Sequence, residues 1–231
     1  MTKGSIFIAS MKMRGKHALH PPHVTVVNVT SMNPLHSQYR RDFSPLSGHA
    51  REGGGYTAPD GRTYLNFEHF WQGGKAWFKD GRRVEGTREF FLKATKPTRR
   101  FPRRAGAVIK HAQWDIPGLS HEMGYVESRK KIYVPYYHTY MKDSASIKLL
   151  KERVDAGESV VVYDFDGPRL GAGERDSMGN VGEKDGDVAC VPVSLDILVN
   201  KINDEKYPFG HGYVVAALLA GIPYEQFTSS Q

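Results

Sequence analysis

A short segment of the chain, residues 66–77, combines an acid, an amide and an amine with several aromatic residues. Glu68, Gln72 and Lys75 follow one another at spacings of four and three residues. If the segment is helical, this spacing places the three side chains on one face. A carboxylate and an amine held side by side against aromatic rings are an arrangement that perturbs pKa values and holds a ring-shaped substrate. The alternative is an amphipathic core helix whose charged groups are solvated.

The helix that would present these side chains is expected to begin after Asn66, a typical N-cap residue, and to end near Asp80 and Gly81. The pair Gly73–Gly74 costs such a helix about 2 kcal/mol relative to alanine. We therefore expect the pair to permit close approach of another backbone or of a ligand. Hydrophobic patterns predict further strands at residues 24–30, 62–64 and 159–163, a polar loop at 171–189, and further helices at 144–156, 194–203 and 214–220.

The composition is that of a chain with a sizeable core, because 39% of its 231 residues are hydrophobic. We predict an α+β fold with a flexible N-terminal arm over residues 1–23, then a mainly helical single domain with a few short strands over residues 24–225. No apolar run approaches the roughly 20 residues that cross a bilayer, so no membrane partner is expected. The single cysteine, Cys190, excludes an internal disulfide. A cytoplasmic location is expected, in the host cytoplasm if the protein is viral.

The formal net charge of +7 favours association with polyanions. Its strongest local source is the segment from residue 93 to residue 110, which contains no acid and is interrupted by Phe101 and two prolines. Basic side chains interleaved with an aromatic residue suit a phosphate backbone or a diphosphate group. The alternative is a solvated loop. The basic residues of this segment are Lys93, Lys96, Arg99, Arg100, Arg103, Arg104 and Lys110.

Two acids follow the predicted strand at residues 159–163, in the run Asp164-Phe165-Asp166-Gly167-Pro168-Arg169. An apolar strand followed by D-x-D-G resembles the phosphatase-type magnesium motif of haloacid-dehalogenase-like enzymes. In that family the motif lies near the N-terminus and continues into threonine, whereas here it is late and continues into proline. A second metal pattern, the spacing of His17, His20 and His23, lacks a nearby carboxylate or cysteine, so no metal site is predicted there.

The element E-H-x-x-Q-x-x-K, formed by Glu68, His69, Gln72 and Lys75, resembles the signature of the NADAR family. These are N-glycosidases that cleave the bond between a ribose and a base, including removal of ADP-ribose from guanine. The order of features over roughly residues 40–220 is also similar, as shown by Phe43-Ser44-Pro45-Leu46, by Trp114 with Met123, and by the closing turn before the last apolar helix. The chain departs from the family pattern in lacking a W-G pair and in having His211 where asparagine is usual. It looks closer to viral and bacterial relatives with an F-W-Q-x-G-K element.

The resemblance implies a role for each matching residue. Lys75 would attack or hold the anomeric carbon, Glu68 would orient the ribose hydroxyls or shuttle a proton, and Asp164 or Asp166 would bind ribose or steer water. Tryptophans, among them Trp77, would stack on the base, and arginines would hold the diphosphate or a strand. The scheme requires no metal and no cofactor. The substrate-binding residues that it implies are His69, Gln72, Trp71, Arg41, Trp114, Arg99, Arg100, Arg103, Arg129 and His211.

Three hypotheses about function therefore follow from the sequence. The first is an N-glycosidase that removes ADP-ribose or a related modification from a base or nucleotide, with an ADP-ribose-like nucleotide or a modified nucleic acid as partner. The second is a nucleic-acid-binding accessory protein that uses residues 93–110. The third is a magnesium-dependent phosphohydrolase that uses Asp164 and Asp166. The sequence does not distinguish a free nucleotide from a polymer and does not determine the oligomeric state.

Overall fold

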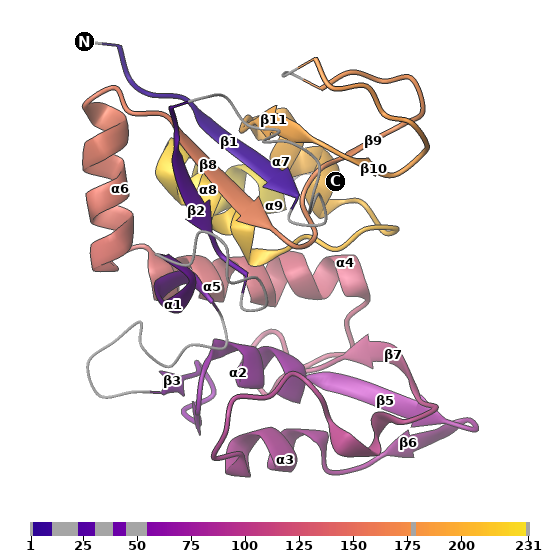
Figure 1. Cartoon of the computed structure of the whole chain (residues 1–231). Helices are drawn as coiled ribbons and strands as arrows, with labels where there is room; N and C mark the ends of the chain where they lie inside the picture. The colour runs from indigo at the N-terminus through magenta and orange to yellow at the C-terminus, as the bar shows by residue number, and fades with distance from the viewer. Residues whose placement is uncertain (1, 11–22, 31–38, 45–54, 177–178, 230–231) are drawn as a thin grey trace. The chain divides into compact units, whose positions relative to one another are not determined.

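The computed structural model describes residues 2–10, 23–30, 39–44, 55–176 and 179–229, and it is mixed α/β (Figure 1). The chain divides into two compact units. Unit 1 comprises residues 1–44 and 137–231, and unit 2 comprises residues 45–136. The expected combination of helices and strands is confirmed. The domain expected over residues 24–225 includes residues of both units. The central segment, unit 2, buries enough aromatic residues to form a core of its own.

Unit 1 is built on a four-stranded sheet with the order β11-β1-β8-β2. Strands β1 (Ile6–Ser10), β8 (Val160–Asp164) and β2 (Thr25–Asn28) are parallel, and β11 (Cys190–Pro192) pairs antiparallel with β1. Helix α8 (His211–Ala220) packs against β1 and β8, as Figure 1 shows. All five residues of β8 are buried, as expected of a strand inside a parallel sheet.

The first strand corrects the expectation of a flexible arm over residues 1–23. Residues 6–10 pair with β8 on one side and with β11 on the other. Ile8 and Ala9 are fully buried, so the short apolar run is an interior strand of a parallel sheet. The sequence does not reveal this because its partner strand, β8, lies about 150 residues further along the chain. Residues 11–22, with His17 and His20, lie outside the described residues.

Most other elements expected for unit 1 are confirmed. Helix α6 (Ala145–Asp155) begins at Ser144, whose side chain accepts a hydrogen bond from the Ile147 amide. Helix α7 (Leu195–Ile202) begins in the same way at Ser194. The expected loop over residues 171–189 ends in a short strand, β10. The remaining elements are α1 (Arg40–Phe43), β9 (Arg169–Leu170), β10 (Asp187–Val188) and α9 (Tyr224–Thr228).

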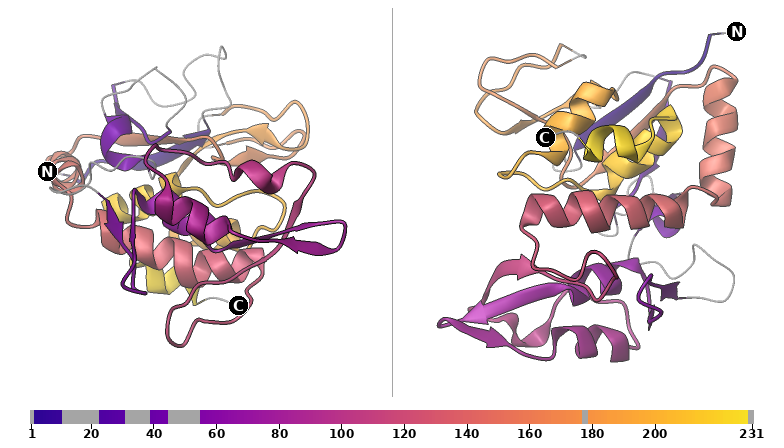
Figure 2. Two further views of the ribbon diagram at one scale, coloured as in Figure 1. Left: turned by 90° about the horizontal axis from the view of Figure 1, so that it is seen from below. Right: turned by 180° about the vertical axis from the view of Figure 1, so that it is seen from behind.

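Unit 2 combines a three-stranded antiparallel sheet with short helices. The sheet has the order β6-β5-β7 and is also visible from behind in Figure 2. Helices α2 and α3 pack against each other. The elements are β3 (Tyr56–Thr57), β4 (Thr63–Tyr64), α2 (Phe67–Gly73), β5 (Lys75–Lys79), β6 (Arg82–Val84), α3 (Thr87–Lys93), the 3-10 helix η3 (Pro102–Arg104), β7 (Val108–Ala112), α4 (Tyr125–Ser128) and the π-helical turn η4 (Arg129–Tyr133). Helix α5 (Val134–Met141) spans the boundary between the units.

Helix α2 begins where the sequence predicts and ends much earlier. The Asn66 side chain accepts a hydrogen bond from the His69 amide at 2.9 Å, which confirms the predicted N-cap. The helix ends at Gly73, however, and does not reach Asp80 and Gly81. Those two residues have φ angles of 50° and 77° and connect β5 to β6. An Asp-Gly pair between two strands is a strong hairpin signal, and it prevails here over the helical spacing.

Gly74 explains why the chain turns at this point. A Cβ atom on residue 74 would lie 2.0 Å from Cε2 of Trp114. The close approach that the glycine pair permits is therefore that of an indole ring, and not of a backbone or a ligand. Gly73 is less restricted, because its nearest neighbour would be a Tyr64 ring atom at 3.4 Å.

Among the described residues, no helix combines the length and the apolar character that crossing a membrane requires.

Replacing Gly74 by alanine should destabilise unit 2, because the fully buried Trp114 ring has no free space to move into. We expect Gly74→Ala to lower the free energy of unfolding by about 2 kcal/mol or more. All three tryptophans lie in unit 2, so their fluorescence during urea unfolding measures this unit. Gly73→Ala is the matched control, and no loss is expected, because alanine favours a helix by up to about 1 kcal/mol relative to glycine and the added Cβ makes only an ordinary contact. Equal losses for the two variants would contradict the steric explanation.

Candidate functional site

The candidate site in unit 2 is centred on Lys75, the first residue of β5. Lys75 is not on the helix that carries Glu68 and Gln72, because α2 ends before it. The turn at Gly74 nevertheless places the Lys75 Nζ atom 5.4 Å from the centre of the Trp71 ring. A cation over an indole face is attracted by the electrons of the ring. The amine and the carboxylate are therefore contributed by two neighbouring elements and not by one helical face.

Glu68 is buried and is held in a defined orientation by its helix neighbour. The Gln72 side chain donates a hydrogen bond of 2.7 Å from Nε2 to Oε1 of Glu68. This is the predicted i, i+4 contact on α2, and it is confirmed. Within the described part of the chain, Glu68 and Lys75 do not form an ion pair closer than 4.0 Å. The carboxylate thus acts on the amine through space rather than as a direct salt bridge.

Burial lowers the pKa of the Lys75 amine, and this effect is larger than the others that act on it. The negative charge of Glu68 raises the same pKa, and the positive charge of Arg104 lowers it further. The net result is an amine that loses its proton more easily than an ordinary lysine. An amine without its proton is a nucleophile, and only this neutral state reacts with carbonyl carbons to give imines.

Trp71 and Trp114 stack on each other, with ring centres 5.2 Å apart and an angle of 16° between the planes. Trp114 is fully buried and donates from Nε1 to the Phe70 carbonyl at 3.1 Å. Stacking on a substrate base, which the resemblance implies, would require this ring to leave the core. Trp71 is also buried and packs against the Tyr133 ring, with ring centres 4.9 Å apart. The Trp77 ring also has a protein group over it, because the guanidinium carbon of Arg104 lies 5.8 Å from its ring centre.

His69 has a structural role instead of the expected contact with substrate. Its side chain is completely buried and packs against the Phe91 ring. The Nε2 atom accepts a hydrogen bond of 3.1 Å from the Thr98 amide. An imidazole that accepts at Nε2 is neutral and has its proton on Nδ1. Burial lowers the pKa of His69, which favours this neutral form. His69 therefore fixes the basic segment, residues 93–110, to α2 at Thr98.

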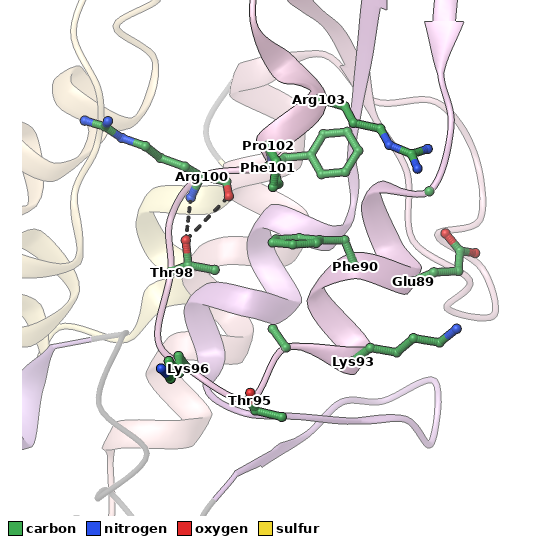
Figure 3. Close-up of a pocket in the computed structure, with 12 residues that line it drawn as sticks. Glu89, Phe90, Lys93, Thr95, Lys96, Thr98, Arg100, Phe101, Pro102 and Arg103 are labelled. Carbon is green, nitrogen blue, oxygen red and sulfur yellow. Dashed lines mark hydrogen bonds between the residues drawn. The ribbon is translucent and has the colours of Figure 1, made fainter.

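The basic segment borders an open pocket of about 700 Å³ next to α3 (Figure 3). Of the three arginines predicted here, Arg100 and Arg103 line this pocket and Arg99 does not. A smaller pocket of about 160 Å³ is lined in part by Lys75. Gly86 and Glu89 line both pockets, so the two are adjacent.

The smaller pocket is lined in part by Arg88 and Asp115, two members of an ion cluster that the sequence does not reveal. Asp115 accepts hydrogen bonds from the guanidinium groups of Arg62 and Arg88. Arg88 also donates to the Gln113 carbonyl at 2.8 Å. The hydrogen bond from Arg62 is the main reason why the pKa of Asp115 is lowered. No local spacing identifies this cluster, because its members belong to separate segments of unit 2.

The other residues that the resemblance implies for substrate binding do not join this site. Arg129 is buried, and its guanidinium carbon lies 4.8 Å from the centre of the Tyr125 ring. Arg41 belongs to α1 in unit 1, and its side chain lies outside the described residues. His211 is in unit 1, where its Nε2 atom donates to the Val29 carbonyl and its ring is buried.

The two predicted acids also belong to unit 1, and they differ from each other. Asp164 is buried at the end of β8, and its carboxylate accepts hydrogen bonds from the amides of Gly212 at 2.7 Å and Phe165 at 2.6 Å. A Cβ atom on Gly210 would lie 2.1 Å from this carboxylate, so the glycines around His211 make room for it. Asp164 thus holds the N-terminus of α8, which is a structural role. Asp166 is partly exposed in the loop that follows.

No group of three or more histidine, cysteine, aspartate or glutamate side chains within the described ranges is placed to hold a metal ion. Both oxygens of Asp164 accept backbone hydrogen bonds. The magnesium-dependent phosphohydrolase hypothesis would need that carboxylate as a ligand, so the geometry does not favour it.

Comparison with known proteins gives one family match. Residues 10–169 match a family described as a family of unknown function, DUF6939, and the chain belongs to this family. The matched region contains both the Glu68–Lys75 segment and the two acids after β8. Comparisons with curated proteins and with solved structures found no match.

The lowered pKa of His69 makes unit 2 sensitive to acid. The unfolded state binds a proton at His69 near pH 6.5, before the folded state does. The free energy of unfolding should therefore fall as the pH decreases below about 6.5 and should be constant with respect to His69 above it. In His69→Gln, this fall between about pH 7.5 and pH 5.5 should become smaller, which tryptophan fluorescence during urea unfolding can measure. An unchanged fall would contradict the buried neutral histidine.

The pKa of Lys75 can be measured directly from the pH dependence of its acetylation, followed by mass spectrometry. Half-maximal reactivity is expected below the ordinary lysine value of 10.5. Because Glu68 raises this pKa and Arg104 lowers it, Glu68→Gln should shift the profile to lower pH and Arg104→Ala to higher pH. The control is Arg103→Ala, which removes the exposed positive charge next to Arg104 in the sequence. A half-maximal pH at or above 10.5 would show that the amine is an ordinary solvated lysine.

Proposed function

We propose that this member of the DUF6939 family is an N-glycosidase that cleaves a ribose–base bond, with ADP-ribose or a related modification of a base or nucleotide as the group removed. One observation supports the proposal most directly: the partly buried Lys75 amine, with a lowered pKa, lies over Trp71 and within the electrostatic influence of Glu68. The resemblance of Glu68, His69, Gln72 and Lys75 to the NADAR signature supports it independently.

The chemistry requires an amine without its proton. In the proposed reaction, neutral Lys75 attacks the anomeric carbon of the sugar and forms a new carbon–nitrogen bond. The glycosidic bond breaks, and its electron pair remains on the base nitrogen, which takes up a proton. Opening of the sugar ring converts the adduct to an imine, and water then hydrolyses the imine to release the sugar and restore the lysine. The net reaction consumes one water and needs neither oxidant nor metal.

Glu68 is the acid–base partner in this proposal. The transition state of glycosidic cleavage has positive charge on the sugar, which a nearby carboxylate stabilises. The carboxylate is also the group that would receive the proton from Lys75 and pass it to the departing base. Gln72 acts as a positioning residue, because its hydrogen bond to Oε1 holds the carboxylate in one orientation.

The proposal depends on residues of unit 2 alone. Asp164, which the resemblance implies as a ribose or water ligand, has both oxygens engaged by backbone amides in unit 1. We assign it no step in the reaction. His69 and Trp114 likewise act by supporting the local structure rather than by contacting the substrate.

The proposal is tested with ADP-ribosylated guanine nucleotide and ADP-ribosylated DNA as substrates, with release of ADP-ribose measured by mass spectrometry in excess chelator. Wild-type protein should release ADP-ribose, and Lys75→Ala and Glu68→Gln should each lose at least about a hundredfold in rate. Reduction with cyanoborohydride during turnover should add the mass of the sugar to Lys75. Lys79→Ala, which removes the exposed lysine of the same strand, is the matched control and should retain full activity. Full release of ADP-ribose by both Lys75→Ala and Glu68→Gln would end the proposal.

A further inference from the structure

The net positive charge of the chain comes from unit 2. Residues 45–136 contain 17 lysines and arginines and nine aspartates and glutamates, a formal net charge of +8. The rest of the chain contains 15 lysines and arginines and 16 aspartates and glutamates, a formal net charge of −1. An excess of this size on one unit attracts polyanions to that unit, whatever chemistry it performs.

The basic segment is held in a defined shape, which argues against a loop that is merely solvated. The Thr98 amide is fixed to the buried His69. The Thr98 hydroxyl accepts a hydrogen bond of 3.2 Å from the Arg100 amide. Phe101 is buried, and its ring centre lies 5.7 Å from that of Phe90. The cations of this segment are therefore presented from an anchored backbone.

The pocket next to α3 combines charge with an aromatic ring. Its lining includes four exposed cations, and Glu89 is the only acid among the lining residues. Figure 3 shows Phe90 in the middle of the pocket, with the cationic side chains extending from its rim in different directions. The four cations are Lys93, Lys96, Arg100 and Arg103.

The direction of these side chains decides between two kinds of anionic ligand. Recognition of one diphosphate group needs donors that converge on it from a sheltered position. The four cations here are exposed and diverge, which suits a chain of phosphates that passes over the pocket. Phe90 is partly buried and offers a ring for contact with an unstacked base. Unstacked bases are available in single strands, whereas a duplex keeps its bases stacked inside.

We infer that this pocket binds a single-stranded nucleic acid, with the four cations neutralising successive phosphates and Phe90 contacting a base. Binding of the strand stands independently of the reaction proposed at Lys75. If that proposed function is correct, the adjacent pocket that Lys75 lines receives a base of the same strand, and the substrate is a modified polymer rather than a free nucleotide.

The test is fluorescence anisotropy with labelled single-stranded DNA and RNA of about 12 nucleotides, a length within the range of known single-strand sites. Four phosphate contacts predict an affinity that falls on the order of fiftyfold between 50 and 200 mM salt. The variant in which Lys93, Lys96, Arg100 and Arg103 are all replaced by alanine should lose nearly all of this salt dependence. Phe90→Leu should weaken binding at least about fivefold with the salt dependence unchanged.

The matched control removes four exposed lysines of unit 1: Lys142, Lys148, Lys184 and Lys206. It changes the net charge by the same amount and should bind the strand as wild type does. Tryptophan fluorescence during urea unfolding verifies that unit 2 remains folded in each variant. Equal weakening of binding in the control variant would show a general charge effect and would overturn the assignment of the pocket.

Two competition experiments complete the test. Free ADP-ribose at millimolar concentration should leave the strand bound, and duplex of the same length should bind at least tenfold more weakly. Displacement by free ADP-ribose, or equal binding of the duplex, would overturn the single-strand inference. Release of ADP-ribose from a free nucleotide without strand binding would refute only this inference, and strand binding without release of ADP-ribose would refute only the proposed reaction.

Discussion

The contact between the Trp114 ring and Gly74 is the constraint on which the arrangement of unit 2 depends. Any side chain at residue 74 would collide with the indole, so only glycine lets the chain pass at this distance. The same indole stacks on Trp71 in the last turn of α2. One buried ring thus fixes both the end of the helix and the beginning of β5. As a result, the Lys75 amine lies over Trp71, where burial lowers its pKa.

Helix α2 shows how one short element serves both proposed sites. On one side, Gln72 orients the Glu68 carboxylate that acts on Lys75. On another side, His69 accepts the hydrogen bond that anchors Thr98 and the basic segment. Phe70 contacts the aromatic core and holds Trp114 through its carbonyl. A shift of this helix would therefore disturb the Lys75 amine and the basic segment together.

Unit 1 illustrates a different use of an acid at the end of a strand. Asp164 is placed where catalytic carboxylates are often found, but it bonds the amide at the start of α8. The two glycines on either side of His211 are needed because the carboxylate occupies the space of their missing side chains. A buried carboxylate satisfied in this way stabilises the junction of β8 and α8. Its position alone is therefore weak evidence for catalysis.

The sequence by itself determined the elements whose signals are local. The Asn66 N-cap, the Glu68–Gln72 contact, the start of α6 at Ser144 and the buried strand β8 all follow from spacing and residue type. Only the tertiary structure decided the end of α2, the inclusion of residues 6–10 in the sheet and the division into two units. It also decided that His69 and Trp114 face the core while Lys93 and Lys96 line a pocket. The physical reason is that burial depends on partners far away in the chain, such as Trp114 for Gly74 and Thr98 for His69, which no local pattern specifies.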